Sequence, residues 1–271
     1  MTRLSAVTRI NPVKVVFLIF LILLGFVLQG CGGGGGGGGS SAAADPTGYY
    51  DVTGTANVKE SDNTTDLMIT DLQAMVSGNR IMIMSTANGL LYDGTITNIT
   101  QNSFTADFVI YTDGKNPVAA TASGTITEGS SITGTLTGTG AGNGTFSLVY
   151  ALGNNQAADL GRIDNSVWDG DLAVGPNYTF SISSLGVLTS QGAAGYNVPI
   201  FDFCEINGTV MPINGTSLYS VTAALTNCGT PAVNGSTYTG FATSRTNAVV
   251  DDTLVFVLSN GTYSPNGELI H

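Results

Sequence analysis

Apolar and polar residues alternate along most of the chain beyond residue 47, which is the period of a β-strand with one buried face. The run SFTADFVIYT shows the pattern clearly, because Phe104, Ala106, Phe108 and Ile110 fall on one side of an extended chain. Many such runs are separated by Asn-Gly or Asp-Gly pairs, which suit tight hairpin turns. The pattern predicts an all-β protein built from short antiparallel strands.

The strand-like runs fall into two groups, each joined by short links. The first group is 48–57, 66–76, 80–86, 90–98, 103–112, 118–127, 131–138 and 144–151. The second is 166–173, 178–184, 186–192, 198–206, 208–213, 217–226, 236–243, 250–258 and 261–264. A meander with one apolar face must close into a barrel or be covered by a second sheet, and closure also removes exposed edges. We therefore expect two tandem antiparallel meander barrels.

The run NNQAADLGR, at 154–162, is the one stretch that favours a helical turn. It places a linker at 154–165 between a first barrel domain at 47–153 and a second at 166–271.

The two halves of this region repeat each other. DGTITNITQNSF, at 93–104, aligns without a gap with NGTVMPINGTSL, at 207–218. In the same comparison of the two halves, Tyr49-Tyr50 aligns with Val167-Trp168, and GTFS from Gly144 aligns with GTYS from Gly261. A period above 100 residues indicates two duplicated domains rather than a solenoid.

The amino-terminal residues have the order of an export signal. Three basic residues precede the apolar run Val15–Leu28, which is shorter than the about 20 residues of a spanning helix. The run ends in Leu28-Gln29-Gly30-Cys31, which resembles the lipobox of bacterial lipoproteins. The resemblance implies removal of a signal peptide, residues 1–30, and attachment of diacylglycerol and an acyl chain such as palmitate to Cys31. A plain membrane-anchoring helix is the alternative.

The residues after Cys31 predict a tether. Gly32–Gly39 and the Ser and Ala residues behind them cannot bury apolar area, so residues 31–46 should form a flexible linker. Gly32 stands where an aspartate marks inner-membrane retention in enteric bacteria, so the resemblance implies the outer membrane of a bacterial cell envelope. The membrane is then a partner through the lipid.

The charge of the chain excludes one class of partner. Without residues 1–30, five basic and nineteen acidic residues remain, which gives a net charge of −14. No basic patch is present, so we expect no nucleic-acid binding.

Two cysteines remain beside the lipidated one. Cys204 and Cys228 both lie in strand-like runs, and in an oxidising envelope such a pair most simply forms a disulfide. A redox-active dithiol is the alternative, although such pairs usually show CxxC spacing.

The second half resembles a β-barrel module of uncharacterised bacterial lipoproteins over about residues 157–260. The resemblance rests on Ala158-Asp159-Leu160, Trp168-Asp169-Gly170, a Cys204 strand, a Tyr219 strand ending in Cys228, and Tyr238-Thr239-Gly240. It supports the barrel and the disulfide, and it implies no activity. A looser likeness to lipocalin and avidin barrels rests on the strand count. The Gly-x-Trp motif of lipocalins is missing, so ligand binding does not carry over.

Catalytic motifs are scarce. The sole histidine is His271, and no nucleotide-binding or GxSxG motif is present, so we expect no enzyme. Carboxylate pairs that could support acid–base chemistry are Asp169 with Asp171, Asp202 with Glu205, and Asp251 with Asp252. Calcium is a weaker alternative, because DNSVWDGDL clusters oxygens but Gly175 stands where an EF-hand has glutamate. Beyond the lipid we expect no cofactor and no metal.

Candidate ligand-binding residues lie on the first strand of the second half: Trp168, Asp169 and Asp171. Trp168, Tyr178, Tyr196, Tyr219 and Tyr238 could stack on sugars, although a lone Trp on a first strand more often plugs a barrel end. The methionines of RIMIMS, at 80–85, could line an adaptable pocket or pack in a core.

Three functions are compatible with these features. The first is a non-enzymatic structural or interaction module of the envelope, with an unidentified protein or glycan partner. The alternative is a barrel that binds a small apolar or carbohydrate ligand, and the third is a carboxylate-based hydrolase. Barrel interiors filled by bulky side chains favour the first, and an open pocket with a few polar groups favours the second.

Overall fold

The computed structural model describes residues 42–112, 115–164, 167–171, 177–192, 204–229, 231, 233–246 and 251–270. Their regular elements are β-strands and three short 3-10 turns, η1 (Gly140–Gly142), η2 (Leu152–Asn154) and η3 (Leu160–Arg162). No helix of this part of the chain is long and apolar enough to cross a membrane. Cys31, Gly175, Tyr196, Asp202 and His271 lie outside the described residues.

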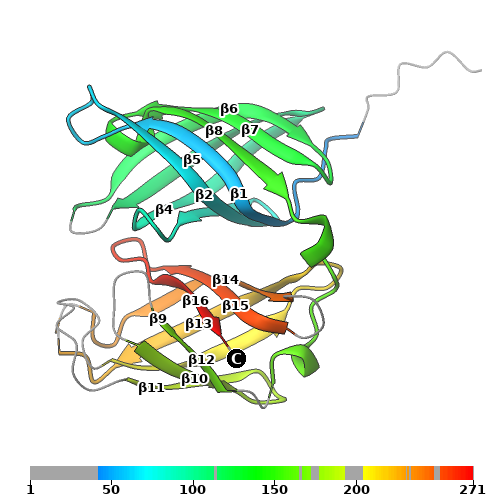
Figure 1. The fold of residues 1–271 in the computed structure, drawn as a ribbon, viewed down its shortest axis with the longest axis vertical. Coiled ribbons are helices and arrows are strands. Elements are labelled where there is room, and N and C mark those ends of the chain that lie inside the picture. Colours follow the sequence, from blue (N-terminus) through cyan, green and yellow to red (C-terminus); the bar gives the residue numbers. More distant parts are fainter. Residues whose placement is uncertain are drawn as a thin grey trace, which may run out of the picture. The chain divides into compact units, whose positions relative to one another are not determined.

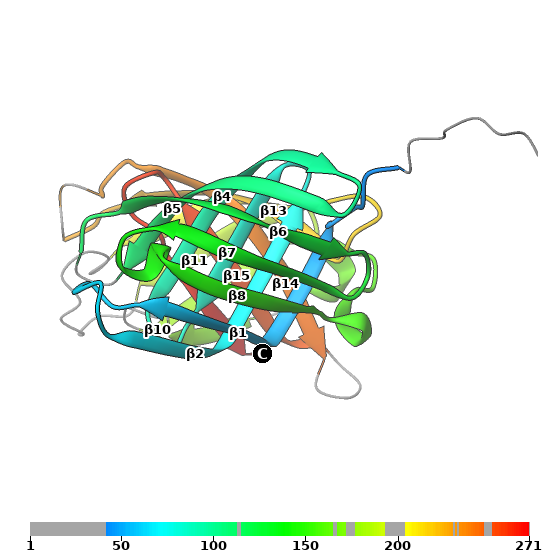
Figure 2. The same cartoon turned by 90° about the horizontal axis from the view of Figure 1, so that it is seen from above.

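The first barrel is a closed, eight-stranded, antiparallel meander (Figures 1 and 2). Each strand pairs with its sequence neighbours, and β1 also pairs with β8 to close the barrel. The strands are β1 (Gly48–Lys59), β2 (Asp66–Ser77), β3 (Arg80–Ser85), β4 (Leu90–Thr100), β5 (Ser103–Thr112), β6 (Val118–Thr127), β7 (Ser131–Gly138) and β8 (Gly144–Tyr150).

The second barrel has the same closed, eight-stranded meander topology, with β16 returning to β9. Its strands are β9 (Val167–Asp171), β10 (Asn177–Ile182), β11 (Val187–Gly192), β12 (Glu205–Pro212), β13 (Leu218–Thr226), β14 (Thr237–Thr246), β15 (Asp251–Ser259) and β16 (Asn266–Ile270). The prediction of two tandem antiparallel barrels is confirmed.

The strand predictions differ from the structure at two places in the second half. The runs expected at 198–206 and 208–213 are not two strands, because residues 205–206 and 208–212 both belong to the single strand β12. The run expected at 261–264 is a connection, in which Asn260 N–H donates to the Tyr263 carbonyl over 3.1 Å, and the last strand is β16. The proposed match of Gly144 with Gly261 is therefore wrong in structural terms, since Gly144 begins β8. In contrast, residues 93–104 and 207–218 both run from the fourth strand of a barrel into the fifth.

Three cross-strand pairs of glycine with phenylalanine fill the first barrel. Gly94 pairs with Phe108, Gly124 with Phe104, and Gly134 with Phe146. A Cβ atom on each glycine would lie less than 3.0 Å from its partner's ring, so the absent side chain makes room for that ring. Alternation of small and large residues lets side chains pack the interior of a small barrel.

Both barrels fix an inward aromatic residue of their first strand in the same way. The Tyr50 hydroxyl donates to the Pro46 carbonyl over 2.9 Å, and the Trp168 indole N–H donates to the Ile163 carbonyl over 3.1 Å. Both side chains are fully buried. The segment that leads into each barrel is thereby tied to its core, and neither buried polar group loses its hydrogen bond.

A third apolar cluster is formed by outward-facing residues of both barrels, and we call it the shared cluster. Its buried members are Tyr49, Met75, Met82, Met84, Leu91, Tyr111, Ala151, Leu218, Phe241, Val255 and Val257. In β3, Ile81 and Ile83 face the core of the first barrel, whereas Met82 and Met84 belong to the shared cluster. The strand is buried on both faces, so the methionines of RIMIMS pack in a core.

Polar contacts join the barrels beside the shared cluster. Arg80 binds Asp93 through two hydrogen bonds of 3.0 and 2.8 Å, and it also donates to the Thr239 hydroxyl over 3.1 Å. Bidentate guanidinium–carboxylate pairs are among the stronger and more directional hydrogen-bonding arrangements in proteins. Arg80 thus links the Asp93 carboxylate of the first barrel to Thr239 of the second.

A second polar chain runs through Gln73. The Tyr49 hydroxyl donates to Gln73 Oε1 over 2.8 Å, and Gln73 Nε2 donates to Glu268 Oε1 over 2.6 Å. Arg245 in turn binds Glu268 Oε2 over 2.5 Å. Burial raises the pKa of Tyr49 above its ordinary value, which keeps its hydroxyl a donor.

The shared cluster predicts that the barrels unfold together. A Met82→Asp substitution would bury a carboxylate in the cluster. This would destabilise the contact between the barrels by several kcal/mol or separate the barrels altogether. We expect one calorimetric unfolding transition for the parent chain and two for Met82→Asp.

The matched control is Met68→Asp, because Met68 lies on the same barrel with 62% of its surface exposed. This variant should keep the single transition. A single, unshifted transition for Met82→Asp would contradict the shared cluster.

Candidate functional site

The residues proposed from sequence do not gather on one face of the second barrel. Trp168 is buried in its core, whereas the next residue, Asp169, accepts a hydrogen bond of 2.7 Å from the exposed Thr179 hydroxyl. Successive side chains of a strand point to opposite faces, so Trp168 and Asp169 cannot line a common site. Asp171 lies in β9, and its side chain is outside the described residues.

The two other aromatic candidates whose side chains the structure describes are also interior, whereas the side chain of Tyr178 lies outside the described residues. Tyr219 and Tyr238 are fully buried, and the Tyr219 hydroxyl donates to the Asp159 carbonyl over 2.8 Å. This contact fixes the linker between the barrels. Neither ring offers an exposed stacking face.

Among the acidic candidates, the structure describes the side chains of Asp169 and Glu205 alone. Glu205 is exposed at the start of β12, and the side chains of Asp251 and Asp252 lie outside the described residues. Within the described part of the chain, no group of three or more His, Cys, Asp or Glu residues could hold a metal ion.

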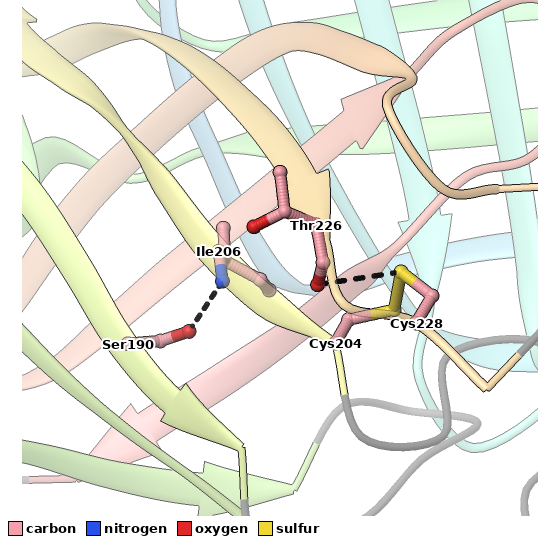
Figure 3. The surroundings of a disulfide bond; sticks show 5 residues. All are labelled: Ser190, Cys204, Ile206, Thr226 and Cys228. Carbon is pink, nitrogen blue, oxygen red and sulfur yellow. Dashed lines mark hydrogen bonds between the residues drawn. A yellow bond between two sulfur atoms is a disulfide. The ribbon is translucent and has the colours of Figure 1, made fainter.

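Cys204 and Cys228 form the predicted disulfide (Figure 3). Cys204 directly precedes β12 and Cys228 follows β13, so the bond joins the open end of one hairpin. Cys228 Sγ lies 3.8 Å from the Thr226 carbonyl oxygen, which is a contact without a proton because a disulfide sulfur carries none. Nearby, Ile206 N–H donates to Ser190 Oγ over 2.9 Å. The disulfide therefore joins the two ends of the β12–β13 hairpin covalently.

The interior of the second barrel holds a cavity of about 30 Å³, lined by apolar side chains including Phe180, Phe256 and Leu269. This is room for one or two waters at most, and apolar cavities of this kind stay dry. The space is too small for an apolar ligand, since ligand sites usually measure about 300–1,000 Å³.

A larger hollow, which we call the mouth pocket, lies at one end of the first barrel. Its volume is about 280 Å³, and it is lined by residues of the β1–β2, β3–β4, β5–β6 and β7–β8 connections. In an up-and-down barrel these alternate connections meet at the same end. The turn η1 forms part of its wall, with Ala141 accepting a hydrogen bond of 3.1 Å from the buried Tyr92 hydroxyl.

The β1–β2 connection fixes Asn63 at the mouth pocket. Asn63 adopts a left-handed conformation with φ of 59°, which asparagine tolerates well. Its Oδ1 accepts a hydrogen bond of 2.6 Å from Gly140 N–H, which ties this connection to η1. Hydrogen bonds from Thr65 and Thr64 hold the Asp62 carboxylate and lower its pKa.

The β3–β4 connection fixes Asn88 in the same pocket. Asn88 Nδ2 donates to Ser85 Oγ over 2.8 Å, and Ser85 Oγ donates to Asp71 over 2.6 Å. Two of the pocket's amides, Asn63 and Asn88, are thus held by their neighbours before any ligand arrives. Sequence reasoning missed this site, although four alternate connections of a predicted meander must share one end.

Comparison of the chain with protein-family models, with curated proteins and with solved structures finds no match.

The disulfide predicts a measurable contribution to stability. Replacing both Cys204 and Cys228 by Ser frees a loop with a sequence separation of 24 in the unfolded chain. The chain-entropy model then gives a loss of about 3–4 kcal/mol in the free energy of unfolding. Urea denaturation followed by tryptophan fluorescence would measure it through Trp168, which lies in the same barrel core.

Leu185→Ser is the matched control, because Leu185 lies in the same barrel with 79% of its surface exposed and the change leaves the disulfide intact. Its midpoint should equal that of the parent chain. Equal midpoints for the double variant and this control would contradict a stabilising disulfide.

Proposed function

We propose that this chain is a lipid-anchored protein of the bacterial cell envelope, directed to the outer membrane, in which two joined barrels act as a non-enzymatic structural or interaction module. The anchor is a diacylglycerol and an acyl chain on Cys31. The barrels then project from the membrane on the glycine-rich tether.

The packed interior is the observation that carries the functional part of this proposal. The core cluster of the first barrel contains 23 buried residues, and an interior cavity of the second, lined by apolar side chains, measures about 30 Å³. A small barrel filled by side chains is a rigid support rather than a container. Its outward faces are then the parts that meet other molecules.

The order of features before the first barrel supports the anchored arrangement. Pairing of the described chain with the barrel begins at Ala44, whose N–H donates to the Gln101 carbonyl over 2.8 Å. The sequence between Cys31 and this point is mostly glycine, serine and alanine. Two or three acyl chains give a durable anchor, since each buried methylene contributes about 0.8 kcal/mol.

Metabolic labelling tests the anchor. We expect radiolabelled palmitate to enter the protein expressed in a bacterial host, and the protein to fractionate with the outer membrane. Cys31→Ser should abolish the label almost completely and leave the precursor uncleaved.

Gly35→Ser is the control, because it changes the tether without removing a thiol. It should label and fractionate as the parent chain does. Equal labelling or equal processing of Cys31→Ser would refute the anchor and with it the proposed localisation.

A further inference from the structure

We propose that the mouth pocket of the first barrel binds a single neutral pyranose ring. The proposal concerns a site that none of the three sequence-based hypotheses located, and it does not rest on the lipid anchor. It stands on the fixed polar groups of the pocket, on its balance of charge and on its size.

The two fixed amides line the pocket and leave opposite kinds of group for a ligand, N–H donors on Asn63 and a carbonyl acceptor on Asn88. Asn63 Oδ1 is occupied by Gly140 N–H, which leaves the two N–H donors of its Nδ2 without a partner among the described residues. Asn88 Nδ2 is occupied by Ser85, which leaves its carbonyl oxygen as an acceptor. A sugar hydroxyl both donates and accepts, so adjacent hydroxyls of one ring match such a pair.

The charges that line the pocket leave no strong preference for an ion. Lys59 is paired with Asp66 over 2.6 Å, and the two remaining charged residues of the lining, Glu60 and Lys115, have opposite signs. Uncharged polar residues predominate around them, among them Ser61, Asn116 and Thr139. This composition suits a neutral ligand with many hydroxyl groups.

The size and floor of the pocket suit one ring. Its volume of about 280 Å³ is near the lower end of ligand sites, which is too small for an extended glycan. Leu67 and Val118 supply aliphatic surface on which the C–H face of a pyranose can rest. Because Gly142 of η1 lies against Ala120 and Ile110 of the barrel interior, the ring would sit above the turn and outside the core.

Saturation-transfer difference NMR on the full chain, in micelles of a detergent without a sugar headgroup, tests the site whether or not the chain carries lipid. The probes are the methyl glycosides of glucose, galactose, mannose, N-acetylglucosamine and glucuronate, with sorbitol as an open-chain polyol control. We expect at least one neutral glycoside to be saturated well above sorbitol and above glucuronate. Asn63→Asp should weaken that signal about fivefold or more, because it replaces the N–H donors with a carboxylate oxygen and keeps the acceptor for Gly140.

Asn98→Asp is the matched control, since Asn98 lies in β4 near the opposite end of the barrel and undergoes the same isosteric change. It should leave the signal unchanged. If Asn63→Asp does not fold, Asn88→Ala decides instead, because it removes the carbonyl acceptor of the second amide, with an expected loss of about threefold. Saturation of no neutral glycoside above sorbitol, or a signal unaffected by the pocket variants, would overturn the proposal while leaving the lipid anchor untouched.

Discussion

The burial of outward-facing apolar side chains between the two barrels is the constraint on which the described structure depends. A closed barrel needs only its inward face to be apolar, and its outward face can remain polar. Met82 and Met84 in β3, and Val255 and Val257 in β15, break this rule and would leave an apolar patch on each isolated barrel. The shared cluster removes both patches from water.

The polar contacts around this cluster define how the barrels fit together. Arg80 and Glu268 each combine an ion pair with a hydrogen bond to the other barrel. Hydrogen bonds need particular distances and angles, whereas apolar contacts tolerate sliding, so these two groups specify the alignment. Asn155 adds a third link from the connecting segment, because its Oδ1 accepts from both Tyr49 N–H and the Ser217 hydroxyl over 2.9 and 2.7 Å. Two barrels joined by these contacts are consistent with the proposed structural role.

Sequence reasoning recovered the first barrel well because its strands alternate and its turns are short. All eight runs correspond to observed strands, and the run at 103–112 matches β5. The missed strand is β16, where Asn266-Gly267 suggests a turn and the polar Asn266 is nevertheless buried. The run RIMIMS lacks alternation because both of its faces are buried, and nothing local reveals that the second face meets another barrel.

The candidate sites also differ in how well the sequence predicts them. The disulfide followed from two cysteines and an inferred compartment, whereas the mouth pocket depends on connections that are far apart in sequence. The sequence suggests Trp168 and Asp169 as ligand-binding residues because they share one strand, although neighbouring side chains of a strand point to opposite faces. The meeting of the four connections at one end, in contrast, follows only from closure of the barrel.

The most direct test of the central claim is backbone ¹⁵N relaxation of the protein in solution. If the shared cluster joins the barrels, amides of β1–β8 and β9–β16 will report one common rotational correlation time, set by the mass of both barrels together. Two shorter correlation times, one for each barrel, would contradict the account.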